Sequence, residues 1–165
     1  MAEAGVAAGD RLKVFISYSR DDLAFADQLV EALDSSGFAP VIDRDGISGG
    51  EAWQPRLTEL IGQCDTVVFV LSPRSASSPI CQWEVDETGR LGKRLIPIIC
   101  VALADAAVPQ RLKDLNYIFF YPEPTSPGSG FGAGLKRLVA ALRTDLAWVR
   151  DQTRYGGLAA SWEAG

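Results

Sequence analysis

The sequence predicts a single α/β domain in which a parallel β-sheet lies between two layers of helices. Short runs rich in Val, Ile and aromatic residues alternate with helical patterns along most of the chain. One of these runs, Thr66–Leu71, is continuously apolar, as expected of a central parallel strand that is covered on both faces. Strands that alternate with helices pair in parallel through right-handed crossovers. We find no internal repeat, so one domain accounts for the pattern.

The first strand is expected at Arg11–Tyr18, where β-forming residues cluster. A helix should then begin at Asp21 or Asp22, since aspartate is a favoured N-cap residue, and end near Gly37. The apolar positions that fall at helical spacing in this segment are Leu23, Ala26, Leu29, Val30 and Leu33.

A second short strand is expected at Phe38–Asp43, followed by the glycine-bearing loop Arg44–Glu51. Ser48 and Glu51 have the spacing of a capping box, which predicts that a second helix begins here. The residues expected on the inner face of this helix are Trp53, Leu57, Leu60 and Ile61.

The second half of the chain continues the alternation after Thr66–Leu71. Ser78 and Pro79 have the pattern of an N-cap followed by proline at the first helical position, which predicts a third helix. The later elements expected are a strand at Arg94–Val101, a helical piece at Gln110–Leu115, a strand at Tyr117–Tyr121, a loop at Pro122–Gly134 and an amphipathic helix from Leu135 to about Val149. The glycine run at 128–134 does not fit a phosphate-binding motif, and we interpret it as a linker.

These elements predict a flavodoxin-like three-layer sandwich whose five-stranded parallel sheet has the order 2-1-3-4-5. In such sheets the ligand crevice lies at the carboxyl ends of the strands, at the point where the winding direction reverses. In this order the reversal falls between the first and third strands. The loops after Tyr18 and after Leu71 should therefore line a site.

Charge and hydropathy exclude several classes of partner. The net charge is −5 without a basic block, so a phosphate backbone would be repelled and nucleic acid is not expected. The longest apolar run, Leu95–Ala104, is too short to span a bilayer and contains Pro97. Residues 1–10 lack the pattern of a signal peptide and are expected to be a disordered leader. We therefore expect a cytoplasmic protein without a membrane partner.

The absence of histidine restricts the chemistry that the chain can perform. It excludes Ser-His-Asp and Cys-His nucleophilic catalysis and most zinc sites. The three cysteines, Cys64, Cys81 and Cys100, lie beside or within apolar patterns and lack C-x-x-C spacing, so we expect reduced thiols without a disulfide or metal. Acid–base work then falls to carboxylates, Lys, Tyr or Cys, and no metal or other cofactor is expected.

Glu84 is the sharpest single feature of the sequence. At about 100° per residue, it falls within an apolar arc of the third helix. The other members of this arc are Ile80, Cys81, Val85, Thr88 and Leu91. A carboxylate on a core-facing stripe is uncommon unless it is paired or functional. Two interpretations stay open: a catalytic group at the crevice, or an ion pair with Arg20 or Arg74 that anchors the helix.

The loop after the first strand brings hydroxyls and one cation to the same crevice, at Ser17, Ser19 and Arg20. The guanidinium fork of Arg20 matches a diphosphate, although a helix start explains the segment equally well. Trp53 is either a core anchor or an aromatic platform for a ring, and Trp83, beside the arc, is a candidate interface residue.

Three segments in order resemble the signature boxes of Toll/interleukin-1 receptor (TIR) domains. Val14–Ser19 resembles the first box, Asp43–Trp53 resembles the BB loop and the start of the following helix, and Leu71–Glu84 resembles the segment that ends in Trp-Cys-x-x-Glu. The resemblance runs from about Lys13 to Leu142. It implies a TIR domain at 11–145 with a C-terminal extension at 146–165.

The resemblance also implies an activity, because many TIR domains cleave NAD⁺ to nicotinamide and ADP-ribose or its cyclic variants without a metal. Glu84 then corresponds to the catalytic glutamate. The other positions implied in substrate binding are Ser17, Ser19, Arg20, Asp45, Trp53, Ser72 and Ile80. Ile80 departs from the family, which has tryptophan four residues before the glutamate, so the expected stacking on nicotinamide loses its π-face.

Two further hypotheses compete with an NAD⁺ hydrolase or cyclase that is switched on by self-association. A non-catalytic adaptor would use its BB loop and neighbouring helices to dock on another TIR domain, and the isoleucine at position 80 favours it. A phosphoreceiver of the same fold fails, because it needs an aspartate where this chain has Leu71 and Ser72. By resemblance, we expect a role in signalling or immune defence.

Overall fold

The computed structural model of the chain describes residues 11–43, 53–103, 112, 115–124, 127 and 129–144. Its strands are β1 (Lys13–Ser17), β2 (Ala39–Val41), β3 (Thr66–Leu71), β4 (Arg94–Ile99) and β5 (Ile118–Phe119). Its helices are the 3-10 turn η3 (Arg20–Asp22), α1 (Leu23–Ser35), α2 (Trp53–Gly62), α3 (Pro73–Ala76) and α4 (Pro79–Arg90). Residues 131–144 form a further helix.

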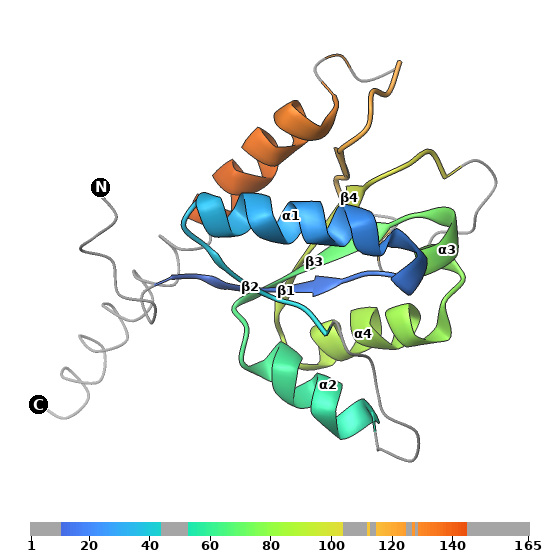
Figure 1. Ribbon diagram of the computed structural model, residues 1–165. Coiled ribbons are helices and arrows are strands. Elements are labelled where there is room, and N and C mark those ends of the chain that lie inside the picture. Colours follow the sequence, from blue (N-terminus) through green and yellow to red (C-terminus); the bar gives the residue numbers. More distant parts are fainter. Residues whose placement is uncertain are drawn as a thin grey trace, which may run out of the picture.

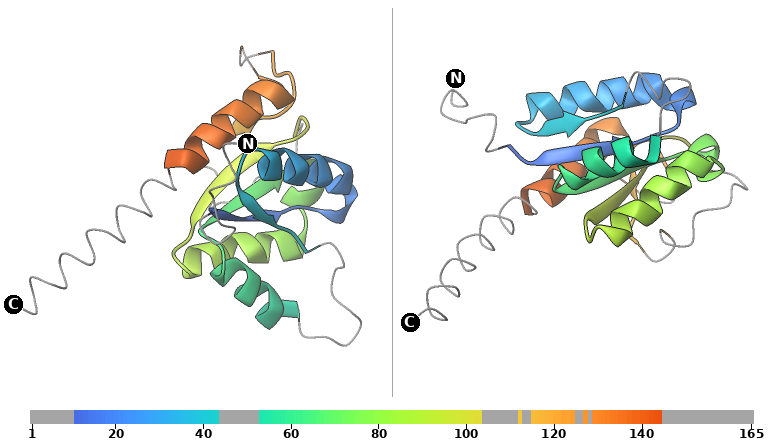
Figure 2. Two further views of the ribbon diagram at one scale, coloured as in Figure 1. Left: turned by 60° about the vertical axis from the view of Figure 1, so that its left-hand side comes forward. Right: turned by 90° about the horizontal axis from the view of Figure 1, so that it is seen from below.

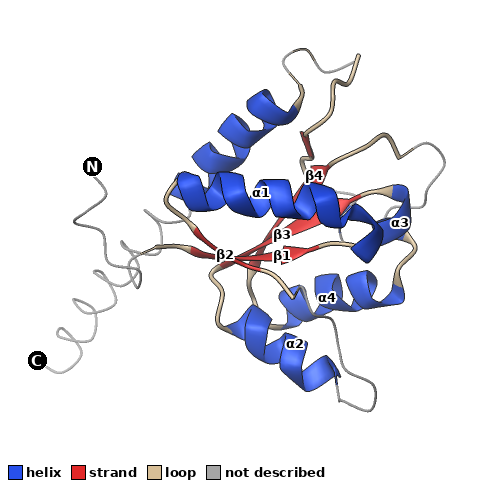
Figure 3. Ribbon diagram, in the orientation of Figure 1, coloured by secondary structure: helices blue, strands red, loops and turns tan. Residues whose placement is uncertain are grey.

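The five strands form one sheet in the order β2-β1-β3-β4-β5, and every neighbouring pair is parallel. This confirms the predicted strand order and the doubly wound α/β class. Figure 1 shows α1 and the 131–144 helix on one face of the sheet and α2 and α4 on the other. Figure 2 shows the same layers from two further directions, and Figure 3 separates the helices from the sheet by colour.

The central strands divide their side chains between the two faces by strict alternation. Val14 and Ile16 of β1 lie in the core cluster under α1, together with Val68 and Val70 of β3. Phe15 lies in the opposite cluster with Val67 and residues of α2. Because successive side chains of a strand point to opposite faces, Ser17 must share the face of Phe15. That face is covered by α2 and α4.

Two carboxylates on α4 contact different neighbours. Glu84 and Glu87 are both buried although both are acidic. Thr58 of α2 donates a 2.5 Å hydrogen bond to Glu87, and Arg90 donates two of 2.6 Å. The bonds from Arg90 and Thr58 lower the pKa of Glu87 to about 2. This contact fastens α2 to α4 and holds Leu57 of α2 beneath the carboxyl end of the sheet.

The structure corrects several predicted boundaries. Every strand except β3 is shorter than predicted, and the short helix α3 lies where no element was expected. The final helix begins at 131 rather than at Leu135, inside the glycine run that we interpreted as a linker. Phe131 packs edge-on against Phe25 and Phe120, and a Cβ on Gly134 would lie 2.8 Å from the Phe119 carbonyl oxygen. Glycine at 134 permits this close approach of helix and strand.

Helix α1 begins where it was predicted, with Asp22 in the N-cap position, but the expected capping bond from an aspartate is absent. Ser19, rather than an aspartate, caps the preceding 3-10 turn by accepting a hydrogen bond from the backbone N–H of Asp21. Asp22 occupies the N-cap position of α1 but makes no capping bond, because its carboxylate is engaged elsewhere. The predicted leader 1–10, the Ser48–Glu51 capping box and the extension 146–165 lie outside the described residues.

Candidate functional site

A cavity of about 270 Å³ opens where β1 and β2 end, and α2 and α4 contribute its other walls. It adjoins the predicted reversal point between β1 and β3, where doubly wound folds bind ligands. The loop after β1 lines it as predicted, but of residues 72–78 only Ser78 does. Its lining residues are Phe15, Ile16, Tyr18, Ser19, Arg20, Asp43, Leu57, Ser78, Ile80, Cys81 and Glu84. The volume is at the small end of ligand pockets.

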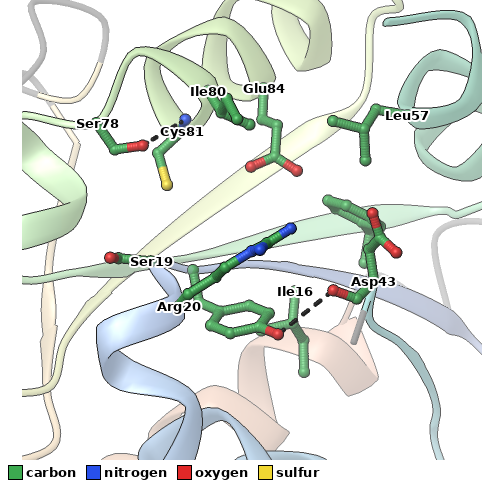
Figure 4. A pocket seen from close by; sticks show the side chains of 11 residues that line it. Ile16, Ser19, Arg20, Asp43, Leu57, Ser78, Ile80, Cys81 and Glu84 are labelled. Atoms are coloured by element: carbon green, nitrogen blue, oxygen red, sulfur yellow. Dashed lines mark hydrogen bonds between the residues drawn. The ribbon is translucent and has the colours of Figure 1, made fainter. Parts of the chain in front are cut away.

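Glu84 reaches the cavity from α4 and is held by the first strand. The Ser17 hydroxyl donates a 2.8 Å hydrogen bond to Glu84 Oε1. Both side chains are buried, with exposed fractions of 1% for Ser17 and 6% for Glu84. The bond follows from the alternation of β1, because Ser17 shares the face of Phe15 and points toward α4. The carboxylate therefore has a fixed position at the wall of the cavity (Figure 4).

The surroundings of Glu84 disfavour its charged form. Burial raises the pKa of Glu84 from its ordinary value of 4.5 to about 8, with a smaller contribution from the negative charge of Asp43. The hydrogen bond from Ser17 acts in the opposite direction and lowers it. At neutral pH the unliganded carboxyl group is therefore mostly protonated. A cation placed in the cavity would favour the carboxylate and would be stabilised by it.

The structure separates the two interpretations of Glu84 that the sequence left open. Within the described residues, neither Arg20 nor Arg74 forms an ion pair with it. Arg74 instead lies 3.3 Å from Asp22 and 3.9 Å from Asp21. Glu84 thus faces a cavity rather than a closed ion pair, and anchoring by an arginine does not explain its burial.

Arg20 provides the cation of the cavity wall. It lies in the 3-10 turn after β1 and is exposed to solvent. In Figure 4 its guanidinium points into the space between Glu84 and Asp43. Among its described lining residues, the pocket therefore combines one cation with two acidic groups.

Asp43 is a site residue that the sequence reasoning missed. It follows β2 and lines the cavity, while Tyr18 donates a 3.4 Å hydrogen bond to its backbone carbonyl. Its Oδ1 is buried and accepts no hydrogen bond within the described residues, although Arg56 lies at an ion-pair distance of 3.4 Å. The sequence contained a signal for this role, because the predicted second strand ends at Asp43 and lies next to the first strand. Asp43 was therefore expected at the same edge of the sheet as the site. Asp45, which we predicted instead, lies outside the described residues.

The remaining predicted residues divide between the cavity and its surroundings. Ser19 and Ile80 line the cavity. Ile80 is 43% exposed, so its predicted place on the core-facing arc is wrong: it lies in the first turn of α4, where the helix overhangs the pocket. Ser72 is fully buried and is not among the lining residues, because its hydroxyl bonds to Asp22. Trp53 begins α2, but its side chain is outside the described part.

Two other side chains near the site are not suited to act on a ligand in the cavity. Trp83 packs against the cluster of Phe15 and Leu57 and is absent from the cavity wall. Burial raises the pKa of Cys81 to about 11, so this lining residue stays a thiol. Among the described residues there is no cluster of acidic or sulfur groups able to hold a metal, and no helix long and apolar enough to cross a membrane.

These features define a class of protein: a doubly wound α/β domain with a buried carboxyl group in a cavity at the carboxyl edge of its sheet. The family model of the TIR domain matches residues 14–139, which is most of the chain. The chain belongs to the TIR-domain family, whose members act in signalling and immunity. No curated protein matches the chain in a sequence comparison.

Solved structures agree on the fold. The TIR domain of the Toll-related receptor TRR-2 from Hydra magnipapillata has a TM-score of 0.60 at 21% identity, over 77% of this chain and 97% of that one. The TIR domains of the activated Roq1 resistosome, which recognises the pathogen effector XopQ, have a TM-score of 0.59 at 16% identity. This match covers 79% of this chain and 99% of that one. The Clostridium botulinum CMP N-glycosidase BcmB has a TM-score of 0.52 at 18% identity. This match covers 76% of this chain and 96% of that one.

Proposed function

We propose that this TIR domain cleaves the N-glycosidic bond of NAD⁺, with Glu84 as the catalytic carboxylate. The observation that carries the proposal is a carboxyl group that is buried, held by Ser17 and free of any described ion pair, in the wall of a cavity. Burying an ionisable group in this way is costly and is commonest where the group acts on a ligand.

The chemistry requires only the residues of this cavity and water. The bond between C1′ of the ribose and the nicotinamide nitrogen breaks, and its electron pair neutralises the nicotinamide, which leaves. Positive charge then develops on the ribose, and the Glu84 carboxylate stabilises it. Water adds to C1′ and releases a proton, which gives ADP-ribose. In a cyclising variant, a nucleophile of the same substrate replaces this water.

Charge complementarity supports NAD⁺ as the substrate. The nicotinamide ring is cationic, and Glu84 and Asp43 line the same small cavity. The guanidinium of the exposed residue Arg20 also points into this cavity. We place the nicotinamide and its ribose next to the acidic groups and the diphosphate next to Arg20, whose guanidinium fork suits phosphate oxygens. Self-association through the BB loop and neighbouring helices is proposed to switch the activity on.

The test is to incubate concentrated protein with NAD⁺ or with CMP and to quantify the released bases by chromatography. CMP is the informative comparison, since it also has an N-glycosidic bond but its pyrimidine is uncharged. We expect nicotinamide from NAD⁺ and no cytosine from CMP. Intact NAD⁺ after prolonged incubation at high protein concentration, with and without crowding agents, would contradict the proposal.

The pKa of Glu84 gives the activity a predicted pH dependence. kcat/KM reports ionisations of the free enzyme, and the carboxylate is the active form. Below pH 8, kcat/KM should therefore rise about tenfold per pH unit and level off above it. In Asp43→Asn the rising limb should shift to lower pH, because a negative charge that raises the pKa of Glu84 is lost. Rates measured from pH 6 to 9 check this, and a profile that falls across this range would assign the protonated form instead.

Ile80 favours the second hypothesis, a non-catalytic adaptor, because it offers an exposed aliphatic surface where a ring-stacking group would serve catalysis. Ile80→Trp should raise kcat/KM for NAD⁺ roughly two- to tenfold, since aromatic stacking contributes about 0.5–1.5 kcal/mol. Ile80→Leu is the matched control and should leave the rate unchanged. If self-association is intact and neither the native chain nor Ile80→Trp releases nicotinamide, the adaptor hypothesis is preferred.

A further inference from the structure

The buried residues Asp22 and Ser72 form a contact between the turn after β1 and the segment after β3. Asp22 is the last residue of η3, the turn that contains Arg20, and is 8% exposed. Ser72 follows β3 directly and is fully buried. The Ser72 hydroxyl donates a 2.5 Å hydrogen bond to Asp22 Oδ2. Residues 50 positions apart in the chain are thus joined beside the cavity but outside its wall.

Both ends of this contact are fixed by further hydrogen bonds. Ser72 also accepts a bond from the backbone N–H of Ser75, and the Ser75 hydroxyl donates to the Val70 carbonyl at 2.8 Å. On the other side, the backbone N–H of Asp22 donates to the Ser19 carbonyl at 2.8 Å, which closes the turn around Arg20. Arg74 adds a 3.3 Å bond to Asp22 from a largely exposed position.

The cavity is therefore held by two separate contacts with different roles. The Ser17–Glu84 bond places the carboxylate, and it does not involve the turn. The Asp22–Ser72 bond places the turn, and it does not touch α4. Arg20 itself forms no ion pair within the described residues, so the anchored backbone of the turn sets the point from which its side chain extends to the cavity.

We propose that Asp22 and Ser72 are positioning residues that hold Arg20 at the cavity for recognition of a diphosphate. This inference rests on the proposed function, since Arg20 and the diphosphate belong to the same site. It also revises the role expected of Ser72 from substrate contact to support of the turn.

Kinetics separate this role from a merely structural one. In Ser72→Ala and Asp22→Ala, KM for NAD⁺ should rise about tenfold with kcat within about twofold, because binding geometry is lost while Glu84 stays in place. Partial unfolding would instead lower kcat and leave KM unchanged. Asp22→Asn keeps an acceptor for Ser72 and should restore KM to within about threefold of the native value. Asp21→Asn, at an exposed neighbouring carboxylate, is the matched control and should have no effect.

A double-variant comparison tests whether the effect passes through Arg20. Arg20→Ala alone should raise KM for NAD⁺ at least as much as Ser72→Ala does. Adding Ser72→Ala to Arg20→Ala should raise KM no further, because the effects of residues that act as a unit are not additive. Additive increases in KM would overturn the proposal.

A second measurement does not depend on NAD⁺ cleavage. In Ser72→Ala, hydrogen exchange at the backbone N–H of Asp22 should accelerate about tenfold or more, while amides of α4 keep their native protection. Unchanged exchange at Asp22 in a folded variant would overturn the positioning role even if NAD⁺ is cleaved. Accelerated exchange in a protein that leaves NAD⁺ intact would support the anchoring of the turn by Asp22 and Ser72. It would refute the proposed function and, with it, the recognition of a diphosphate by Arg20.

Discussion

Glu84→Gln should reduce nicotinamide release about 10³-fold or more, because a neutral amide cannot stabilise the positive charge that develops on the ribose. The substitution keeps the size of the side chain and retains an oxygen that accepts the Ser17 hydrogen bond. KM should change little, since Arg20 and the rest of the cavity wall stay in place. Steady-state kinetics with nicotinamide as the measured product give both parameters.

Glu87→Gln is the matched control for this experiment. Glu87 lies on the same helix and is equally buried, but it bonds to Thr58 and Arg90 rather than facing the cavity. Its substitution should leave kcat within about threefold of the native value, as for residues outside the reacting site. Full activity in Glu84→Gln, or an equal loss in both variants, would remove Glu84 from the mechanism.

The same substitution should make the protein increasingly stable relative to the native chain as the pH rises from 5 to 8. The pKa of Glu84 is about 8 in the folded protein and near 4.5 when unfolded, so between these values the unfolded chain binds one proton fewer. The free energy of unfolding of the native protein then falls by about 1.4 kcal/mol per pH unit in this window. Glu84→Gln lacks this ionisation. From pH 5 to pH 8, the difference in free energy of unfolding between Glu84→Gln and the native protein should therefore grow by on the order of 3 kcal/mol in favour of the variant. Urea denaturation at several pH values measures the difference.

Glu87 supplies the control of opposite sign. Its folded pKa is lowered to about 2, so it contributes stability above about pH 4.5 that is lost as the pH falls toward 2. Glu87→Gln should therefore be less stable than the native protein at neutral pH, and the difference should vanish in acid. If both variants show the same pH trend, the stability changes do not arise from these two ionisations.

The predicted gain in stability and loss of activity at one residue have a common cause. A desolvated carboxylate destabilises the unliganded fold and is able to interact strongly with a cation in the cavity. Asp43 adds to this arrangement, because its charge raises the pKa of Glu84 from across the pocket. A cationic substrate would relieve this unfavourable arrangement on binding.

Local pattern predicted the fold well where hydrophobic spacing was strong. The central strand β3 has the predicted bounds, and Ser78 caps α4 as expected by accepting a bond from the backbone N–H of Cys81. Composition misled at the start of the final helix, where glycines were interpreted as a linker. Gly134 is instead required by the 2.8 Å approach to the Phe119 carbonyl, a contact between segments that no local pattern records.

By itself, the sequence determined the alternation of strands and helices that gives a parallel α/β sheet and the inward direction of Glu84, because these depend on periodicities that neighbouring residues express together. Only the tertiary structure decided what each side chain contacts. Ser17 bonds to Glu84, Ser72 bonds to Asp22, Asp43 lines the same cavity as Glu84, and Ile80 is exposed to solvent. These contacts depend on crossovers that bring residues dozens of positions apart to one edge of the sheet. A short window of sequence can predict which face of its element a residue occupies. It cannot predict the partner that another strand or helix places against that residue.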